Sequence, residues 1–150
     1  MKTDLDTKDL RILEALQKDA RTPLSEIGRK VGLSQPAVAE RVRRLEEAHV
    51  IEGYHARVNP AALGYHLQAF IRVSQHQHRP TEKWAEKKAE VLQCHVVTGD
   101  DCAVLRVLAR DVKHLEQLIV ELNQFGSTAT SIVLSSAVDG RVLKSAAALK

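Results

Sequence analysis

The chain has 150 residues, of which 44% are hydrophobic and 27% charged, which suits one ordinary folded domain or two small ones. It contains no apolar run near the ~20 residues that span a membrane and opens with no signal-peptide pattern, so we expect a cytoplasmic protein without a membrane partner. The formal net charge is +3, a weak bias towards polyanions. A nucleic-acid surface would therefore depend on local arrangement of charge.

The first predicted helix begins at a clear capping signal. Asp6 is a predicted N-cap, Asp9 adds negative charge to the first turn, and Leu5 and Leu10 occupy the positions of a hydrophobic staple. We expect this helix to end before Pro23.

Residues 24–44, LSEIGRKVGLSQPAVAERVRR, predict a helix-turn-helix. From Leu24 onward, apolar residues recur at i, i+3 and i+7, and Gly32 can take the positive φ of a tight turn. Ser34 is the predicted N-cap of a third helix, with Pro36 in its first turn and an end near Ala48. Two short helices at this spacing, the second one basic, are the parts of a major-groove reader.

The second of these helices carries the candidate DNA contacts. Gln35 can pair with adenine through two hydrogen bonds, Arg41 can reach guanine or phosphate, and Arg43 and Arg44 suit the phosphate backbone. An ordinary amphipathic helix with solvated arginines is the alternative, which the preceding helix and turn disfavour. The predicted DNA-binding residues are Ser25, Ser34, Gln35, Pro36, Ala37, Glu40, Arg41, Arg43 and Arg44.

Two domains follow from the change of pattern after residue 59. Three helices alone bury little, so we expect a short wing over residues 51–58 to complete a first domain, residues 1–59. Residues 60–65, PAALGY, form the predicted hinge, and residues 66–150 form the second domain.

Residues 66–138 alternate between strand and helix patterns. The expected elements are a strand over 66–74, a helix over 81–90, strands over 91–97 and 102–109 joined by a turn at 98–101, a helix capped by Asp111 and stopped by Gly126, and a strand over 129–138. This βαββαβ order is that of a ferredoxin-like domain. The predicted fold class is α+β: a winged helix-turn-helix followed by this domain.

The predicted sheet has apolar residues on both faces. Four residues of strand 102–109 can face the helices, while apolar side chains also mark the opposite face, at Val104, Leu108, Val97 and Val133. An open antiparallel sheet normally exposes one polar face to water. We therefore expect a second subunit to cover this face in a homodimer.

The two cysteines flank the predicted hairpin turn. If the turn has four residues, Val97 pairs with Cys102 and Cys94 with Leu105, so that the thiols point to opposite faces. We predict no disulfide.

No pattern indicates an enzyme or a cofactor. His76 and His78 share one face of a strand, but they lack Cys or His partners at ligand spacing, so we predict no metal site. The sequence contains no nucleophile elbow, phosphate-binding loop or dinucleotide-binding turn.

The segment from Leu5 to Tyr65, LDTKDLRILEALQKDARTPLSEIGRKVGLSQPAVAERVRRLEEAHVIEGYHARVNPAALGY, resembles the N-terminal half of Lrp/AsnC (leucine-responsive, or feast/famine) transcription regulators. The second half, with VTGDD between its middle strands, is similar to their effector-sensing and assembly domain. His49 stands where the family commonly has glycine after the third helix, which implies a left-handed residue there.

The resemblance implies dimers, often assembled into octamers, that bind a small ligand, usually an amino acid, between subunits. The family's ligand site involves the glycine-acid turn, here Thr98, Gly99, Asp100 and Asp101. Exposed N–H groups of such a turn could capture a carboxylate while an acid pairs with an ammonium group. A plain hairpin turn is the alternative.

We therefore expect a sequence-specific transcriptional regulator that dimerises through its C-terminal domain, senses an amino acid there, and is no enzyme. One alternative is a tetrapyrrole (sirohaem-type) decarboxylase of the same architecture, for which His66, His95 and His114 would be candidates. The other is a nucleoid-type DNA-binding protein that needs no ligand.

Overall fold

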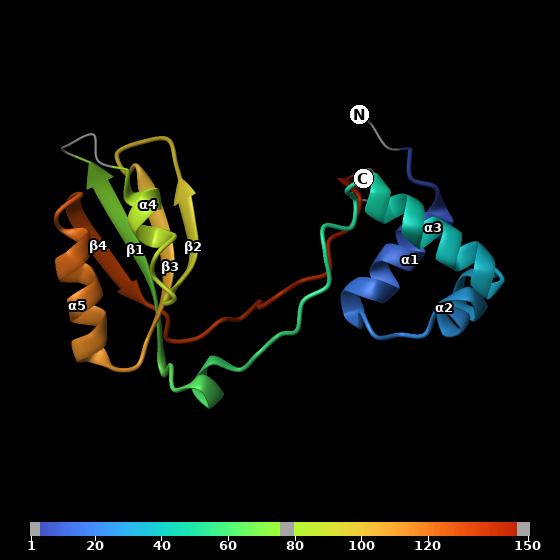
Figure 1. Ribbon diagram of the computed structural model, residues 1–150, viewed down its shortest axis with the longest axis horizontal. Coiled ribbons are helices and arrows are strands. Elements are labelled where there is room, and N and C mark those ends of the chain that lie inside the picture. Colours follow the sequence, from blue (N-terminus) through green and yellow to red (C-terminus); the bar gives the residue numbers. More distant parts are fainter. Residues whose placement is uncertain (1–3, 76–79, 147–150) are drawn as a thin grey trace. The chain divides into compact units, whose positions relative to one another are not determined.

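A computed structural model describes residues 4–75 and 80–146 (Figure 1). The chain forms two compact units, one made of residues 1–56 with 138–150, the other of residues 57–137. The sequence places everything from residue 66 onward in one domain, whereas the segment from residue 138 groups with the first unit. His76 and His78 lie outside the described residues.

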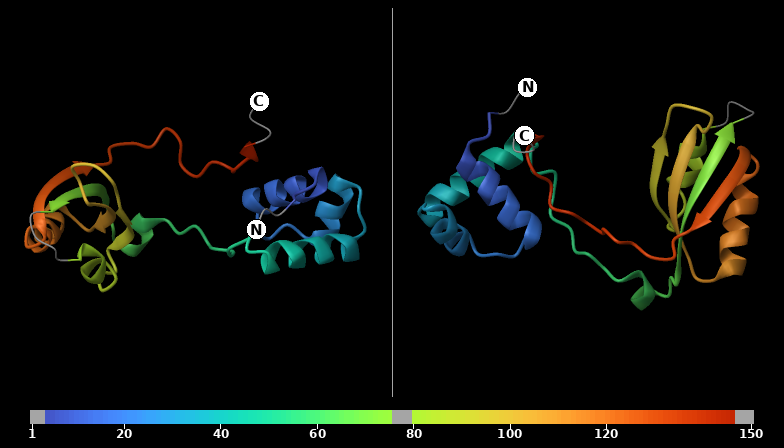
Figure 2. Two further views of the ribbon diagram at one scale, coloured as in Figure 1. Left: turned by 90° about the horizontal axis from the view of Figure 1, so that it is seen from above. Right: turned by 180° about the vertical axis from the view of Figure 1, so that it is seen from behind.

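The first unit contains three helices, shown in blue to cyan in Figures 1 and 2: α1 (Thr7–Lys18), α2 (Leu24–Val31) and α3 (Gln35–Glu47). The predicted cap of α1 is confirmed, because the Asp6 carboxylate accepts a hydrogen bond from the Asp9 N–H while the Asp9 carboxylate accepts one from the Asp6 N–H. The helix ends at Lys18, before Pro23 as expected.

The turn between α2 and α3 depends on two glycines. Gly32 is left-handed with φ of 69°, as predicted. Gly28 faces this turn, and a Cβ there would lie 2.5 Å from the Leu33 carbonyl oxygen. The close approach lets the three helices bury one apolar cluster: Ile12, Leu16, Ile27, Val31, Val38, Val42 and Leu45.

The predicted wing over residues 51–58 is wrong. The structure assigns no helix or strand to residues 52–58, and all their side chains are exposed. A wing needs two strands that pair with each other. The segment instead runs on as a linker to a 3-10 helix, η1 (Pro60–Leu63), in the second unit.

The second unit confirms the βαββαβ order. Its elements are β1 (Leu67–Gln75), α4 (Thr81–Ala85), β2 (Val91–Val96), β3 (Ala103–Ala109), α5 (Val112–Leu122) and β4 (Gly126–Ile132). The four strands form one sheet in the order β2-β3-β1-β4, and each neighbouring pair is antiparallel. The hairpin register is also as predicted, with Cys94 opposite Leu105.

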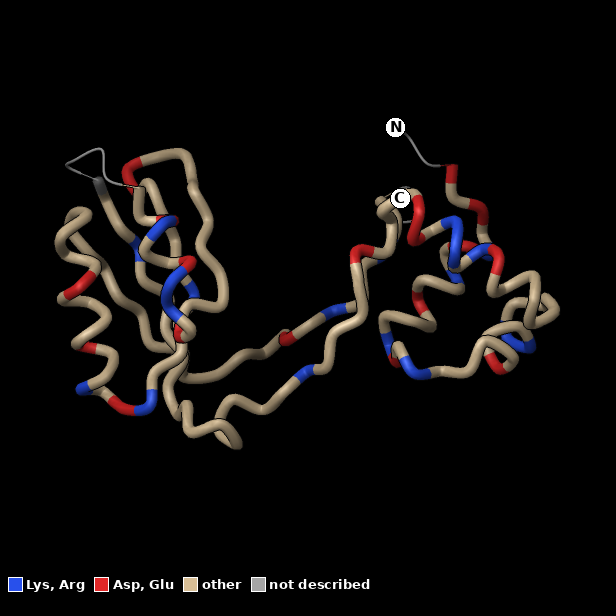
Figure 3. Tube along the Cα trace, in the orientation of Figure 1, with Lys and Arg blue, Asp and Glu red and all other residues tan. Residues whose placement is uncertain are grey.

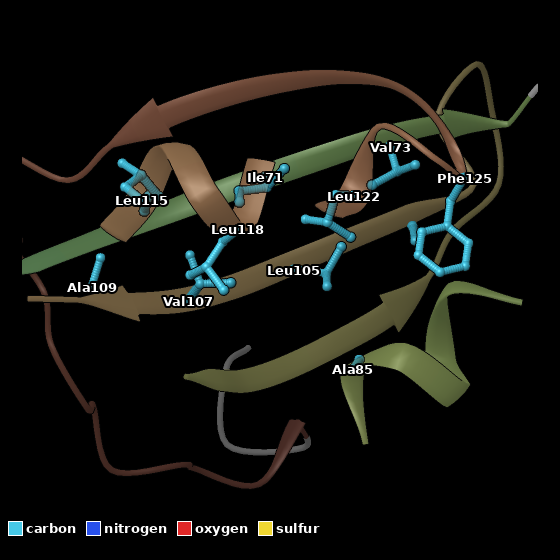
Figure 4. Close-up of a cluster of buried hydrophobic side chains, with 12 residues drawn as sticks. Ile71, Val73, Ala85, Leu105, Val107, Ala109, Leu115, Leu118, Leu122 and Phe125 are labelled. Atoms are coloured by element: carbon cyan, nitrogen blue, oxygen red, sulfur yellow. The ribbon is translucent and has the colours of Figure 1, made fainter. Parts of the chain in front are cut away.

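One face of the sheet carries the core of this unit (Figure 4). Ile71 and Val73 of β1 and Leu105 and Val107 of β3 pack beneath α5, which is capped by Asp111 as predicted. The pattern of four apolar residues facing the helices from β3 is confirmed, since all four are buried: Ala103, Leu105, Val107 and Ala109.

Two elements differ in length from their predictions. Helix α4 ends at Ala85 instead of residue 90, and Lys88, which lies beyond the helix, pairs with Glu121 of α5 at 2.6 Å. Strand β4 starts at Gly126, the residue expected to stop α5, and ends at Ile132. The helix had already ended at Leu122, so Gly126 serves as the first strand residue.

The other face of the sheet, here called the outer face, mixes apolar and polar side chains. Phe70 lies opposite Arg106, and its side chain is exposed although it sits on an inner strand. Leu108 on the same face is buried and borders a shallow hollow together with Pro60 and Tyr65. Both cysteines are free thiols and half-buried.

Candidate DNA-reading helix and effector turn

Helix α3 presents a charged surface opposite its buried side. Val38, Val42 and Leu45 face the core, so Glu40 and Arg43 point away from it. Most of the predicted DNA-binding residues are exposed: Ser25 at the start of α2, and Ser34, Gln35, Pro36, Glu40, Arg43 and Arg44. Ala37 is half-buried, and its N–H donates to the Ser34 hydroxyl that caps the helix.

Arg41 differs from the other arginines of α3. Its guanidinium donates to Asp6 and to Asp9 of α1, each at 2.7 Å, and its side chain is 23% exposed. Asp9 is almost completely buried. In the free protein Arg41 therefore fastens α3 to α1, and its predicted role as a reader of guanine stays a prediction.

The ion pairs at the start of α1 shift the pKa values of the groups that form them. The pKa of Asp6 lies below its ordinary value because the Asp9 N–H and the Arg41 guanidinium donate to its ionised carboxylate. The pKa of Arg41 is raised because its guanidinium donates hydrogen bonds to the carboxylates of Asp9 and Asp6. Both shifts favour the charged forms that hold the two helices together.

Arg43 is enclosed by two carboxylates of its own helix. Its Nε and Nη2 donate to Glu40 at 3.0 and 2.5 Å, and its Nη1 donates to Glu47 at 2.5 Å. All three side chains are more than half exposed. The exposed face of α3 therefore holds an arginine whose charge is already paired. Glu47 was not among the DNA-binding residues predicted from the sequence, although its i, i+4 spacing from Arg43 is a detectable signal.

Arg44 is the third arginine of α3 and has the weakest internal contact. Its Nη2 lies 4.0 Å from the Asp9 carboxylate, and its side chain is 56% exposed. Arg29 and Lys30 of α2 are also exposed, and they border a shallow hollow with Glu26. These cations suit phosphate contacts on either side of a groove.

The predicted effector turn lies between β2 and β3. The Val97 N–H donates to the Cys102 carbonyl oxygen at 3.1 Å, and Gly99 has φ of 116°. Thr98, Gly99 and Asp100 are exposed, so their polar groups are accessible to a ligand. The turn therefore has the form that the sequence predicts.

Asp101 is half-buried and bound to strand β1. Its carboxylate accepts a hydrogen bond from the Ser74 hydroxyl at 2.9 Å and lies 3.6 Å from the Arg72 guanidinium. The pairing of β1 with β3 brings Arg72 and Ser74 next to the turn, and the sequence alone did not indicate either residue. A cation and an acid thus meet directly beside the exposed turn.

The histidines of the decarboxylase alternative differ in their surroundings. His114 is buried, and its Nε2 lies 3.3 Å from the Glu90 carboxylate, while His95 is exposed on β2 and His66 is exposed just before β1. Among residues 4–75 and 80–146, no group of three His, Cys, Asp or Glu side chains could hold a metal ion.

Positive and negative positions are interspersed in both units (Figure 3). No helix in the described part of the chain is long and apolar enough to cross a membrane.

Comparison with known proteins assigns both units. Residues 5–46 match the AsnC-type helix-turn-helix domain, and residues 68–143 match the Lrp/AsnC ligand binding domain. The HTH-type transcriptional regulator LrpA of Pyrococcus horikoshii is 42% identical over 118 residues, which cover 77% of this chain and 83% of that protein.

Two solved structures extend the match to the fold. The transcriptional regulator NMB0573 of Neisseria meningitidis, in complex with L-Met, has a TM-score of 0.89 at 26% identity over 97% of this chain and 99% of that chain. The feast or famine regulatory protein Rv3291c of M. tuberculosis, complexed with L-methionine, has a TM-score of 0.83 at 35% identity over 92% and 97%. The chain belongs to the Lrp/AsnC family of DNA-binding transcriptional regulators.

Proposed function

We propose that this protein reads specific operator DNA with the exposed face of α3 and changes its binding when an amino acid occupies the second unit. The observation that carries the DNA-reading role is the capped helix-turn-helix with Gln35, Glu40, Arg43 and Arg44 exposed on its second helix. These side chains offer hydrogen-bonding groups for base edges and cations for phosphates. Such a regulator catalyses no reaction and acts in the cytoplasm, beside the DNA.

The effector is proposed to bind at residues 98–101. The exposed turn supplies N–H groups, Asp100 supplies a negative charge for an ammonium group, and Arg72 supplies a positive charge for a carboxylate. A free α-amino acid carries both of these groups. Two related proteins of the same fold have been solved with L-methionine, which supports an amino acid as the ligand class.

The functional unit is proposed to be a homodimer, with octamers as the next level of assembly. Support comes from the outer face of the sheet, where Phe70 stays exposed at the centre of the sheet and Val104 is half-buried. A dimer would place two α3 helices on half-sites about one helical turn apart or a multiple of it.

A gel mobility-shift titration at fixed salt tests the function. The full chain is mixed with the DNA upstream of its own gene and with a scrambled duplex, with and without each of the twenty amino acids. We expect tighter binding to one duplex than to the scrambled one, and a change in affinity with one amino acid. Equal binding to both duplexes with no amino-acid effect would favour a nucleoid-type role.

A substitution tests the location of the effector site. Asp100→Asn should abolish the response to the amino acid while DNA binding without it stays unchanged, because the ammonium group loses its counter-charge. Glu116→Gln, which removes an exposed acid on α5, is the matched control. If Asp100→Asn retains the full response, the effector binds elsewhere.

A further inference from the structure

We propose that Glu40 and Glu47 hold Arg43 in a carboxylate clamp that suppresses sequence-independent DNA binding and so raises the specificity of α3. The inference rests on the proposed DNA-reading role of this helix and deepens it. It assigns a specificity-determining function to two acids on the surface that faces DNA.

The geometry of the clamp is compact. The Arg43 guanidinium donates through Nε and Nη2 to the two oxygens of Glu40, which is a bidentate pair, and through Nη1 to Glu47. The acids lie one turn before and one turn after the arginine, so both flank it along the exposed face. The three side chains together carry a net negative charge.

A negative surface opposes binding to arbitrary DNA. Binding without sequence preference comes from cations that neutralise phosphates and release counterions. Arg43 can contribute to this only by leaving Glu40 and Glu47, and the two carboxylates would then face a polyanion without their partner. The clamp therefore removes one phosphate contact and adds electrostatic repulsion on every duplex.

An operator can compensate for opening the clamp. A carboxylate in the major groove can accept a hydrogen bond from the amino group of cytosine, and a guanidinium can donate two hydrogen bonds to guanine. Glu40 and Arg43 lie one turn apart on α3 and are hydrogen-bonded to each other, so a C·G pair or two neighbouring pairs can satisfy both groups at once. Only a matching sequence replaces the bonds that the clamp gives up.

Another exposed charge pair of the first unit provides the control for a change in net charge. Glu14 and Lys18 of α1 form an exposed i, i+4 pair at 2.6 Å, which resembles the Arg43–Glu47 pair in spacing and exposure. This pair lies outside α3, so neutralising Glu14 changes the net charge of the protein by the same amount without opening the clamp. Glu14→Gln is therefore the matched control for both acids.

The experiment measures the affinity of the full chain for two duplexes over a series of salt concentrations. One duplex is selected from a random pool by the wild-type protein, and the other has the same composition in scrambled order. The variants are Glu40→Gln, Glu47→Gln and the control Glu14→Gln. Circular dichroism during heating verifies that each variant is folded.

We expect Glu40→Gln and Glu47→Gln to bind the scrambled duplex more tightly, by a factor on the order of threefold to tenfold, with a salt dependence steeper by about one phosphate contact. For Glu40→Gln the ratio of selected to scrambled affinity should fall, because a neutral amide is a weaker acceptor for the cytosine amino group than the carboxylate and adds a donor that cytosine does not match. Glu14→Gln should match the wild type.

Two outcomes are distinguishable. If the wild type binds the selected duplex preferentially but the α3 variants bind the scrambled duplex no better than Glu14→Gln does, the clamp has no role in specificity. If the wild type selects no sequence and binds no duplex, the proposed DNA-reading function itself fails, and the inference fails with it.

Discussion

At the scale of single residues, Arg41 and Arg43 show how helix geometry separates side chains that look alike in the sequence. Both are arginines on α3, two positions apart. Arg41 lies beside the buried stripe and reaches α1, whereas Arg43 lies opposite that stripe and meets only acids of its own helix. One therefore holds the three-helix unit together, and the other lies exposed on the surface, paired with Glu40 and Glu47.

The role of Arg41 predicts a loss of stability. Arg41→Ala should destabilise the first unit by roughly 2 kcal/mol, because the buried Asp9 carboxylate loses its guanidinium donor. Urea unfolding of the full chain, followed by circular dichroism, measures this. Arg44→Ala is the matched control, since its contact with Asp9 is 4.0 Å long. Unchanged stability with lost sequence preference would instead restore Arg41 as a base reader.

His49, which follows the C-cap residue Ala48 of α3, has a left-handed backbone with φ of 52°. Its N–H donates to the Glu46 carbonyl oxygen, and the Val50 N–H donates to that of Leu45, so this residue closes the end of the helix. The resemblance to a family with glycine here implied this conformation, and the structure confirms it. A residue with a Cβ pays a steric cost in this region.

The conformation of His49 predicts a gain in stability on substitution by glycine. His49→Gly should stabilise the first unit by about 0.5–1 kcal/mol, because the steric cost disappears while glycine adds some entropy to the unfolded chain. Thermal unfolding checks this. His49→Ala separates the causes, since it removes the imidazole but keeps the Cβ. Equal stability of the two variants would refute the backbone explanation.

At the scale of elements, the C-terminal segment makes a contact with α1 that no sequence pattern predicts. The side-chain amide of Gln17 in α1 donates to the Leu143 carbonyl oxygen at 3.1 Å and accepts from the Leu143 N–H at 2.8 Å. The Leu143 side chain itself is exposed. This paired amide contact fastens the segment to α1 through the backbone of Leu143.

The Gln17 contact predicts a local effect on hydrogen exchange. In Gln17→Ala the Leu143 N–H should exchange about fivefold faster, because it loses a hydrogen bond of about 1 kcal/mol. Amide exchange followed by NMR measures this. Gln117→Ala, on the exposed face of α5, is the control. Unchanged exchange at Leu143 would show that the paired contact does not persist in solution.

At the scale of the whole molecule, the two faces of the sheet determine how subunits can associate. The inner face is covered by α4 and α5 of the same chain, while the outer face keeps Phe70 accessible between polar neighbours. A single subunit gives no reason for an exposed aromatic ring at the centre of a sheet. A second copy that covers the outer face would supply one.

A substitution of Phe70 tests whether subunits associate through the outer face of the sheet. Phe70→Glu should shift the sedimentation coefficient of the protein towards that of a monomer, since a buried unpaired carboxylate disfavours the interface. It should also weaken DNA binding, because a dimer places two α3 helices on one duplex. Val120→Glu, an equally drastic change on the exposed side of α5, should leave the mass unchanged. A dimeric Phe70→Glu protein would exclude this face as the interface.

Local structure and family membership were both predictable from the amino-acid sequence. Caps at Asp6, Ser34 and Asp111, the turn at Gly32 and the apolar periods fixed the helices, and the alternation along β1 and β3 fixed the buried face of the sheet. These features depend on neighbours within a few residues, so they are visible in a linear pattern.

The pairing of charges and the contacts between distant segments depend on the three-dimensional packing of the chain. The bond between Arg41 and Asp9 joins positions 32 residues apart, and that between Ser74 and Asp101 joins positions 27 apart. The expected wing failed for the same reason, since a strand exists only when another segment lies beside it. Such contacts depend on how the helices and strands pack, which periodicity and composition do not encode.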